Sequence, residues 1–369
     1  MPSPRLTSSS PARDVAAALV AIAAAGWASP VLAAPCGAEK VAEVLAPASE
    51  KQRSVSLACD LTLDSKDVVT KQIVFAGKAA SGARLDCGGA KIDGGPTTVN
   101  RNRDMIVVRS KGSTPAEMAA DRPQGLTVTN CRIEGSIRVI GLGRNGEDPA
   151  VRASSRSLGH TERAQAAAPT GLVFSKLTLV AAGRIPFYLA PGVTGVTLAE
   201  SRLSGRSDGT GIYLDAESAH NRIVGNRIAV DTSQREQLAI DGSADNRIAD
   251  NHFSALSNGG VYVYRNCGEG GTVRHQSPRR NVIEGNEFYY DRYIGPSPAI
   301  WLGSRGGFRW YCLLDRGHSF GSSNDDGDNA DFNTVTANRI VRRPPEAMIR
   351  DGGRQNRIEG NRTIAEPTR

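Results

Sequence analysis

Short runs of alternating apolar and polar residues recur along the second half of the chain. They share the form Asn-x-[Ile/Val]-x-x-Asn-x-apolar, and successive copies begin 25, 35, 52 and 23 residues apart, at Asn221, Asn246, Asn281, Asn333 and Asn356. This alternation predicts two short strands per copy, with the apolar side chains on one face. Because one copy cannot bury that face alone, the repeat predicts a solenoid whose stacked coils share a core.

The paired asparagines predict how the coils turn and stack. Asparagine tolerates the left-handed backbone conformation that a tight corner needs. On successive coils, identical side chains can also hydrogen-bond along the solenoid. Weaker copies without the full asparagine pair lie upstream, at 125–133, 171–179 and 193–203. The two longer spacings equal one coil plus an insertion.

These motifs resemble those of the right-handed parallel β-helix proteins of the pectate-lyase-like superfamily, over roughly residues 76 to 365. The resemblance implies an all-β solenoid, a right-handed parallel β-helix. It leaves the activity open, because the superfamily includes lyases, hydrolases, epimerases and noncatalytic proteins. The full polygalacturonase motif set and the Asp-Pro-His-Asp motif of alginate epimerases are absent from the sequence. Residues 40–47 predict a short helix that caps the first coil.

The first 34 residues have the pattern of an export signal. Arg5 and Arg13 precede an apolar run at 15–27, and residues 31–33 offer small side chains for cleavage. The run is shorter than the about 20 residues of a membrane-spanning helix, and no later segment qualifies. We therefore expect export to the periplasm or the cell exterior, with a signal peptide at 1–34, an N-terminal cap at 35–75, and a β-helix with cleft-forming loop insertions at 76–369.

Six cysteines follow the apolar run, and none forms a Cys-x-x-Cys pair. An even number in an exported chain favours disulfides over a zinc site. Six cysteines allow 15 pairings, and the sequence alone does not choose among them. We expect sequential pairing, in which one bridge closes the cap, one joins early coils and one joins two insertions: Cys36–Cys59, Cys87–Cys131 and Cys267–Cys312.

The formal net charge of +7 favours an anionic partner. For an exported protein, that partner is an acidic polysaccharide or a membrane surface rather than nucleic acid. A generic basic surface explains the same charge equally well. The sequence makes no prediction of the oligomeric state.

A third strand in each coil carries the candidate site residues. Side chains alternate along a strand, so the residues between the apolar positions are expected to face solvent. Aromatic residues in such a row suit stacking on sugar rings, although cross-strand packing beneath a loop is the alternative. One predicted ladder contains Arg138, Tyr188, Tyr213, Tyr262 and Trp301, and the next contains Asp215, Asp241 and Tyr264.

Asp215 and Asp241 are expected on adjacent coils, with backbones about 4.8 Å apart. Carboxylates this close repel, so one pKa should rise unless a cation lies between them. Three interpretations remain open. The pair binds Ca²⁺ as oxygen ligands, forms an acid and a base or nucleophile for glycoside hydrolysis, or consists of strand-end residues that each pair with an arginine. Glu217 also faces outward if the strand of Asp215 continues.

Three long insertions are expected to leave the solenoid on one edge and to wall a cleft above these ladders. They follow the strand of Arg138, the strand that ends at Tyr264, and the strand of Trp301. Histidine can carry a proton near neutral pH, and arginine can bind a carboxylate with two hydrogen bonds. The candidates on the second and third insertions are Arg265, Glu269, Arg274, His275 and Arg305.

These residues favour an exported enzyme that cleaves glycosidic bonds of an acidic polysaccharide, by hydrolysis or by β-elimination. Hydrolysis would use the carboxylates of Asp215, Asp241, Glu217 or Glu269. Elimination would need a group that neutralises a uronate and a base at C5, and the arginines, His275 and the tyrosines are candidates. The alternatives are a noncatalytic carbohydrate-binding or envelope-assembly protein and a purely structural repeat protein.

Overall fold

The computed structural model describes residues 33–95, 104–290 and 297–367. The predicted signal peptide lies outside these residues, apart from its last two positions. These described residues all fall within one compact unit. Within the described ranges, no helix has both the length and the apolar character to cross a bilayer.

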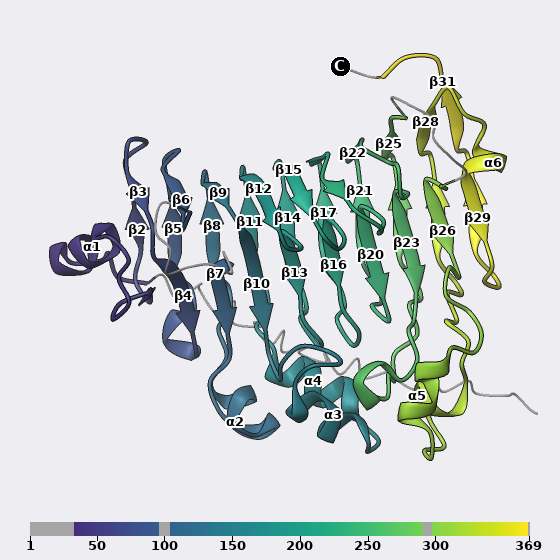
Figure 1. The fold of residues 1–369 in the computed structure, drawn as a ribbon, viewed down its shortest axis with the longest axis horizontal. Helices are drawn as coiled ribbons and strands as arrows, with labels where there is room; N and C mark the ends of the chain where they lie inside the picture. Colours follow the sequence, from purple (N-terminus) through teal and green to yellow (C-terminus); the bar gives the residue numbers. More distant parts are fainter. Residues whose placement is uncertain (1–32, 96–103, 291–296, 368–369) are drawn as a thin grey trace, which may run out of the picture. The chain divides into compact units, whose positions relative to one another are not determined.

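Three parallel sheets run the length of this unit, and each coil contributes one strand to each sheet (Figure 1). The sheets contain 10, 10 and 11 strands. The first sheet is β1 (Ser54–Ser56), β4 (Gln72–Ala76), β7 (Asp104–Arg109), β10 (Ser136–Ile140), β13 (Phe187–Leu189), β16 (Ile212–Leu214), β20 (Leu238–Asp241), β23 (Val261–Tyr264), β26 (Ile300–Leu302) and β29 (Ile349–Asp351).

The other two sheets contain the strands of the repeat itself. The second sheet is β2 (Leu61–Thr62), β5 (Arg84–Asp86), β8 (Thr127–Thr129), β11 (Val173–Ser175), β14 (Thr197–Ala199), β17 (Arg222–Val224), β21 (Arg247–Ala249), β24 (Val282–Glu284), β27 (Thr334–Thr336) and β30 (Arg357–Glu359). The third is β3 (Val68–Val69), β6 (Lys91–Asp93), β9 (Arg132–Glu134), β12 (Thr178–Gly183), β15 (Arg202–Ser207), β18 (Arg227–Ile228), β22 (His252–Phe253), β25 (Glu287–Phe288), β28 (Arg339–Val341) and β31 (Arg362–Ile364), with β19 (Asp231–Thr232) beside β15.

The fold is therefore a parallel β-helix, which confirms the predicted fold class. The inward-facing side chains of all three sheets form one core. Phe253 and Phe288 stack in it on adjacent coils, with ring centroids 5.0 Å apart. The residues of the first sheet that were predicted to point inward are all buried: Ile212, Leu214, Leu238, Ile240, Val261, Val263, Ile300 and Leu302.

Two ladders of buried asparagines hold successive coils in register. In the first ladder, the backbone N–H of Asn221 donates to Oδ1 of Asn246, at 3.0 Å, and that of Asn246 donates to Asn281. In the second, Asn226 donates to Asn251 in the same way. The predicted stacking of asparagines is confirmed. Each side-chain oxygen satisfies a buried donor that would otherwise lack a partner.

The asparagines do not themselves adopt the left-handed conformation, and that expectation was wrong. The residue before each one does: φ is +58° at His220, +57° at Asp245 and +56° at Arg280. At the second corner the same place is taken by Gly225, with φ of +65°, which glycine adopts without strain. The asparagine that follows is then free to direct its side chain along the solenoid.

The N-terminal end of the core is covered by helix α1 (Ala38–Leu45), as predicted. Val44 of this helix is buried, and the buried ammonium of Lys71 donates to the carbonyl of Glu43 at 2.7 Å. All three predicted disulfides are formed, namely Cys36–Cys59, Cys87–Cys131 and Cys267–Cys312. Three disulfides are typical of a protein in an oxidising compartment.

The long insertions leave the first sheet at the ends of β10, β23 and β26, and Figure 1 shows them together along the lower edge of the solenoid. We call them the first insertion (141–169), the second insertion (265–280) and the third insertion (303–332). They contain α3 (Pro149–Ser155) and α4 (His160–Ala167), then η3 (Glu269–Gly271), then η4 (Trp310–Asp315) and α5 (Gly321–Asn324). Shorter helices precede or follow other strands: η1 (Lys78–Ala80), α2 (Pro115–Ala120) and α6 (Pro345–Met348).

Asn251→Ala is expected to destabilise the solenoid by about 1–3 kcal/mol, because it leaves the buried N–H of Asn226 without an acceptor. Urea unfolding monitored by far-ultraviolet circular dichroism measures the change. Arg227→Ala, on the exposed face of β18, is the matched control. Equal stability of the two variants would show that the ladder does not stabilise the fold.

Candidate functional site

The outer face of the first sheet carries the predicted ladder of aromatic and basic residues. Strand register aligns Arg138 with Tyr188, and Tyr188 with Tyr213. Ala239 interrupts the row before Tyr262 and Trp301. The Tyr188 and Tyr213 ring centroids are 5.9 Å apart, and the Arg138 guanidinium lies 5.3 Å from the centre of the Tyr188 ring.

The expectation that this ladder faces open solvent was wrong at one end. Arg138 and Tyr188 are buried, while Tyr213, Tyr262 and Trp301 are half-buried. The side chains do point away from the core, as strand alternation requires. Loops and neighbouring polar side chains pack over Arg138, Tyr188 and Tyr213, so these three residues form the floor of a covered site.

The second ladder is buried more deeply. Asp241 of β20 pairs in register with Tyr264 of β23. Asp215 directly follows β16, the strand that pairs with β20 on the other side. Asp215 is 3% exposed, and both Asp241 and Tyr264 are 0% exposed. Two neighbouring buried carboxylates need compensation by positive charge and hydrogen bonds.

That compensation comes from Arg274 of the second insertion, whose side chain is buried between the carboxylates. Its guanidinium forms an ion pair with Asp241 and lies 3.8 Å from Oδ1 of Asp215. Its other terminal nitrogen lies 3.2 Å from the more exposed carboxylate of Glu269. Although burial alone would lower the pKa of Arg274, the two aspartates raise it well above its ordinary value. The side chain is therefore a permanent cation.

Asp241 is held as an anion. It accepts hydrogen bonds from the Tyr213 hydroxyl at 2.5 Å and from the Asn266 side-chain amide at 2.8 Å. Burial would raise the pKa of Asp241, but Arg274 and the Tyr213 hydrogen bond hold it below its ordinary value. Asp241 is thus a fixed negative charge beneath the site.

Asp215 has the opposite tendency. It accepts hydrogen bonds from the Tyr188 hydroxyl at 2.6 Å and from the Asn145 side-chain amide of the first insertion at 3.2 Å. Burial raises the pKa of Asp215 to about 6, and the Asp241 charge adds to this effect against the opposing influence of Arg274. Two neighbouring aspartates therefore have pKa values shifted apart, a pattern common at catalytic sites.

The aspartate pair does not fit the Ca²⁺ interpretation. The arginine between them supplies the positive charge that a cation would bring, and their oxygens accept hydrogen bonds from tyrosine hydroxyls and asparagine amides. Among the residues that the structure describes, no group of three or more His, Cys, Asp or Glu side chains could hold a metal ion. The interpretation in which each aspartate pairs with its own arginine holds only in part, because both aspartates contact Arg274.

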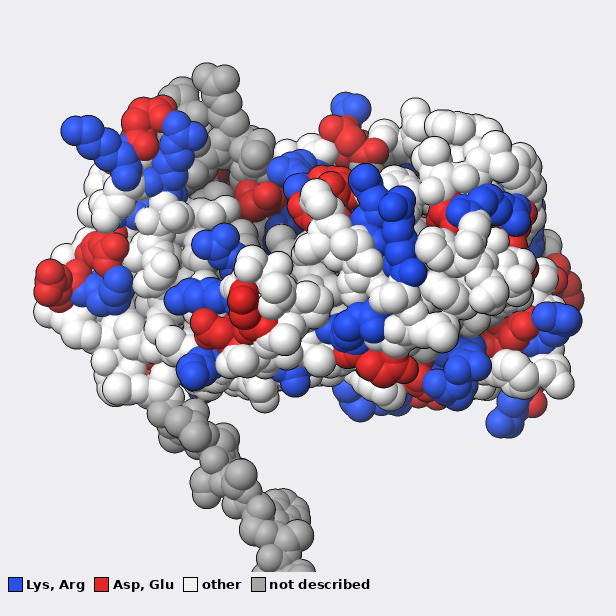
Figure 2. All heavy atoms as spheres, turned by 90° about the horizontal axis from the view of Figure 1, so that it is seen from below, with Lys and Arg blue, Asp and Glu red and all other residues white. Residues whose placement is uncertain are grey.

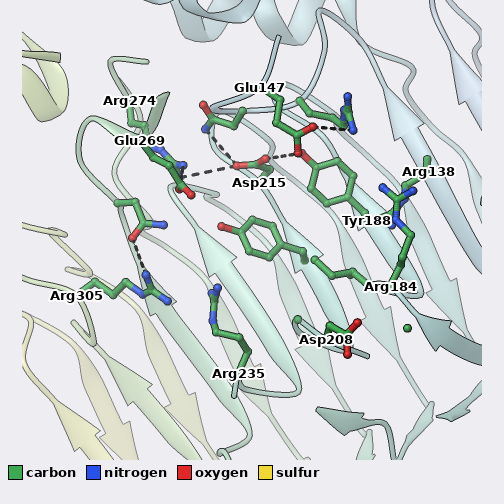
Figure 3. A pocket seen from close by; sticks show the side chains of 17 residues that line it. Arg138, Glu147, Arg184, Tyr188, Asp208, Asp215, Arg235, Glu269, Arg274 and Arg305 are labelled. Atoms are coloured by element: carbon green, nitrogen blue, oxygen red, sulfur yellow. Dashed lines mark hydrogen bonds and ion pairs between the residues drawn. The ribbon is translucent and has the colours of Figure 1, made fainter. Parts of the chain in front are cut away.

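A cavity of about 370 Å³ opens above Asp215 (Figure 3). The three insertions and the outer face of the first sheet all contribute to its wall. It is rich in charged groups, with six arginines and four carboxylates. The lining residues are Arg138, Arg144, Asn145, Glu147, Gly183, Arg184, Ile185, Tyr188, Asp208, Gly209, Tyr213, Asp215, Arg235, Asn266, Glu269, Arg274 and Arg305.

Arginines stand at both ends of the cavity. At one end, Arg138 and Arg184 share the single carboxylate of Asp104, at 3.0 and 3.3 Å, so this end keeps an excess positive charge. At the other end, the Arg305 guanidinium lies 4.7 Å from the centre of the Tyr264 ring and donates to Asn266 at 3.2 Å.

Arg235 joins this second group. Its guanidinium donates to the Tyr264 hydroxyl at 2.5 Å and pairs with the buried carboxylate of Glu236 at 3.1 Å. The Tyr264 hydroxyl in turn donates to Glu236 at 2.7 Å. Tyr264 therefore does not line the cavity but supports two arginines that do.

Several residues predicted as catalytic lie outside the cavity. Glu217 is buried and accepts hydrogen bonds from the Thr161 hydroxyl and from the backbone N–H groups of His275 and Gln276. It thereby joins the first and second insertions to the solenoid. The condition set for Glu217, that the strand of Asp215 continues, is not met, because that strand ends at Leu214, and Glu217 is buried beneath the insertions.

His275 and Arg265 also point away from the cavity. A ring nitrogen of His275 lies 2.7 Å from the carbonyl oxygen of Ser155, and its ring contacts Phe320 at 4.8 Å between centroids. The buried Arg265 guanidinium donates to the carbonyls of Asp325 and Gly327, both at 2.9 Å. Both side chains tie insertions together, and neither lines the cavity.

Of the predicted binding residues, Tyr262 and Trp301 lie beyond the cavity on the same sheet face. Their rings meet edge to face, with centroids 5.5 Å apart, and Arg350 lies 5.0 Å from the Trp301 ring centre. They lie on the coils that follow the cavity toward the C-terminus.

Sequence reasoning missed several cavity residues that share one position. They lie in the turns that lead into strands of the first sheet: Arg184 before β13, Asp208 before β16 and Arg235 before β20. Alignment of those turns on the strands that follow them would have found them. Asn145 and Asn266 lie in insertions, and no repeat positions them.

Comparison with known proteins gives similarity at the level of solved structures. No protein-family model matches the chain, and no curated protein matches it. The Dettilon tailspike protein is 15% identical, with a TM-score of 0.40, over 83% of this chain and 62% of its own. An alginate lyase from Paenibacillus sp. is 12% identical, with a TM-score of 0.36, over 70% of this chain and 98% of its own.

The A-module of the mannuronan C-5 epimerase AlgE6 from Azotobacter vinelandii is 12% identical, with a TM-score of 0.35, over 84% of this chain and 81% of its own. The present chain thus spans less than two thirds of the tailspike's length. At these identities the likeness concerns the fold alone.

Arg274→Met is expected to lower the free energy of unfolding by about 3–5 kcal/mol, because it leaves the buried Asp241 carboxylate without its cation. Urea unfolding measures the loss. The double variant Arg274→Met/Asp241→Asn should recover part of it, because the stranded charge is then gone. Arg206→Met, at an exposed position, is the control. No recovery in the double variant would contradict this account.

His160 gives a prediction for stability against pH. It is buried in α4, and burial, with the nearby His275 and Arg163, lowers the pKa of His160 to about 3. An unfolded histidine titrates near 6.5, so between about pH 6.5 and 3 the unfolded state binds more protons. The free energy of unfolding should therefore fall as the pH decreases through this window.

Urea unfolding of His160→Gln and of the parent at pH 7, 6, 5 and 4 tests this expectation. The variant should lose part of the pH dependence, whereas the exposed His220→Gln should keep it. Identical slopes for His160→Gln and the parent would mean that His160 is not a source of acid sensitivity.

Proposed function

We propose that this protein is an exported carbohydrate-active enzyme that hydrolyses glycosidic bonds of an acidic polysaccharide. The observation that carries the proposal is the arginine-lined cavity over Asp215, a buried carboxyl group whose pKa is raised to about 6. Such a group can remain protonated in mildly acidic solution and give its proton to a leaving oxygen.

The cavity wall supports an acidic substrate. Its six arginines outnumber its four carboxylates, and arginine is the side chain best suited to bind carboxylate or sulfate groups with two hydrogen bonds. Arg138 and Arg184 share one carboxylate between them, which leaves charge at that end for a ligand anion. A volume of about 370 Å³ falls within the range of small-ligand sites.

In the proposed reaction, Asp215 is the general acid. Its neighbours Tyr188 and Asn145 hold the carboxyl group in place through their hydrogen bonds. Glu269 is the second carboxylate of the pair, with a side chain that is 57% exposed and oriented by Arg274. It would act as the base or nucleophile on the other side of the scissile bond.

The same geometry disfavours β-elimination. Elimination needs a base that removes the C5 proton of a uronate, and tyrosine serves only when it ionises near the working pH. Burial and the neighbouring aspartates raise the pKa values of Tyr188 and Tyr213 well above the ordinary value. His275, the other candidate base, points away from the cavity. The carboxylates are then the groups that remain for proton transfer.

A second candidate function is glycan binding without cleavage. It is favoured by the near-complete burial of Asp215, which accepts three hydrogen bonds and contacts Arg274. A purely structural role for Asp215, in which it organises the binding surface, would account for so many partners. The two functions differ in whether a substrate chain is shortened.

The proposed location is the periplasm or the cell exterior. The export-signal pattern of residues 1–34 and the three disulfides both support it. An oxidising compartment also suits the Cys267–Cys312 bridge, which joins two insertions that line the cavity.

Incubation with acidic and neutral polysaccharides tests the proposal. Reducing ends should appear without the ultraviolet absorbance of an unsaturated uronate. Asp215→Asn should lower the rate by about 100-fold or more, because it removes the proton donor. Asp208→Asn, which changes an exposed carboxylate of the same cavity, should leave most of the rate.

The rate should also decrease as the pH rises through about 6, because Asp215 then loses the proton that it donates. Absorbance that grows with the reducing ends would mean elimination instead. Binding of a polysaccharide without any shortening, unchanged in Asp215→Asn, would favour the noncatalytic function.

A further inference from the structure

The third insertion exposes large apolar side chains that lie outside the cavity. Four of them fall within seven residues: Phe308 is 59% exposed, Trp310 74%, Leu313 62% and Leu314 52%. None of these lines the cavity. Elsewhere in the described residues, exposed large hydrophobic side chains are scattered singly along the sequence. A contiguous exposed apolar patch is typical of an interaction surface.

The segment that carries these side chains is firmly held. Cys312 of η4 is joined to Cys267 of the second insertion. The buried Asp315 carboxylate accepts hydrogen bonds from the N–H of Gly268, at 3.0 Å, and from the Ser322 hydroxyl. Because its base is fixed at these points, η4 cannot easily turn its apolar side chains inward.

Basic residues of the first insertion lie beside this patch. A Cβ atom placed on Gly271 would be 3.3 Å from the Leu314 carbonyl oxygen, 3.5 Å from the Arg156 guanidinium and 3.8 Å from the Arg152 side chain. These groups therefore meet at one place. Arg152 and Arg156 form no ion pair with any residue in the described part of the chain. Leu158, close by in sequence, is 71% exposed.

We define the apolar rim as Phe308, Trp310, Leu313 and Leu314 of the third insertion. It lies on the edge of the solenoid from which the insertions emerge. Figure 2 looks onto that edge from below and shows Lys and Arg side chains beside uncharged surface. The rim thus combines apolar side chains with unpaired positive charge.

We propose that the apolar rim docks this protein on an anionic lipid bilayer. Tryptophan and leucine partition into the boundary between headgroups and acyl chains, and arginines attract anionic headgroups. Trp310, Leu313 and Leu314 enter the interface, while Arg152 and Arg156 contact lipid phosphates. Docking would hold the cavity close to polysaccharide at the membrane surface.

Two other partners fit less well. A polysaccharide would stack on aromatic rings and bind polar groups, but it offers Leu313 and Leu314 no apolar surface to pack against. A second copy of the chain that met the same rim would bring the unpaired arginines of both copies together, and like charges repel. An anionic bilayer complements both the apolar and the basic components.

Co-sedimentation of residues 35–369, the chain without its predicted signal peptide, with vesicles tests the proposal. Phosphatidylcholine vesicles that contain roughly 30% phosphatidylglycerol should bind the protein, and pure phosphatidylcholine vesicles should bind it about tenfold more weakly, because anionic headgroups attract basic side chains. Trp310→Ser/Leu313→Ser should reduce binding to the anionic vesicles by about tenfold. Arg152→Gln/Arg156→Gln should also reduce binding to the anionic vesicles by about tenfold. At high salt this double variant and the parent should bind equally, because salt screens the charges.

Val68→Ser, at an exposed apolar position of β3, and Arg206→Gln, at an exposed basic position of β15, are matched controls that should bind like the parent. The emission of Trp310 should shift to the blue on anionic vesicles and not on neutral ones. Cleavage or binding of a soluble polysaccharide should be unchanged in the rim variants. Failure to bind either vesicle, equal binding by the rim variants, or rim variants that lose soluble polysaccharide instead would each overturn the proposal.

Discussion

The parallel stacking of coils depends on the hydrogen bond that each buried ladder asparagine accepts from the coil before it. The N–H of the buried Asn226 donates to Oδ1 of Asn251 on the next coil. A coil that slipped by one residue would lose this bond and would also turn its apolar side chains outward. From the coil of Val196 and Ser201 onward, the two ladders therefore hold successive coils in register, and with them the outward-facing residues of those coils.

The candidate site follows from that register. Two tyrosines of the first ladder each donate to an aspartate contributed by the following coil, from Tyr188 to Asp215 and from Tyr213 to Asp241. The two pairs have the same form, yet the pKa of one carboxyl is raised and that of the other is lowered. The difference arises because Arg274 forms its close ion pair with Asp241 and stands farther from Asp215. One loop residue thus gives a repeated scaffold an asymmetric chemistry.

The sequence alone was sufficient to predict the structural features that repeat from coil to coil. Alternation predicted the strands, recurrence predicted the asparagine ladders, and simple succession along the chain predicted the disulfides. It was insufficient for the loops, because their conformations depend on contacts with distant segments. Arg274 and His275 are neighbours and looked equivalent, but one reaches the aspartates and the other packs on Phe320. The ladder residues were expected in solvent because the path of the covering loops could not be read from their composition.

Arg274 also constrains how this β-helix can change over time. The coils supply the buried aspartates, whereas the loop between β23 and β24 supplies their counter-charge. Neither part is tolerable alone, since a coil without the loop would bury uncompensated negative charge. In solenoid proteins, the loops can usually be replaced without changing the stacked coils, because each coil contacts only its neighbours. Here the loop and the two coils must be inherited together, so a change of specificity is more easily made in the first and third insertions.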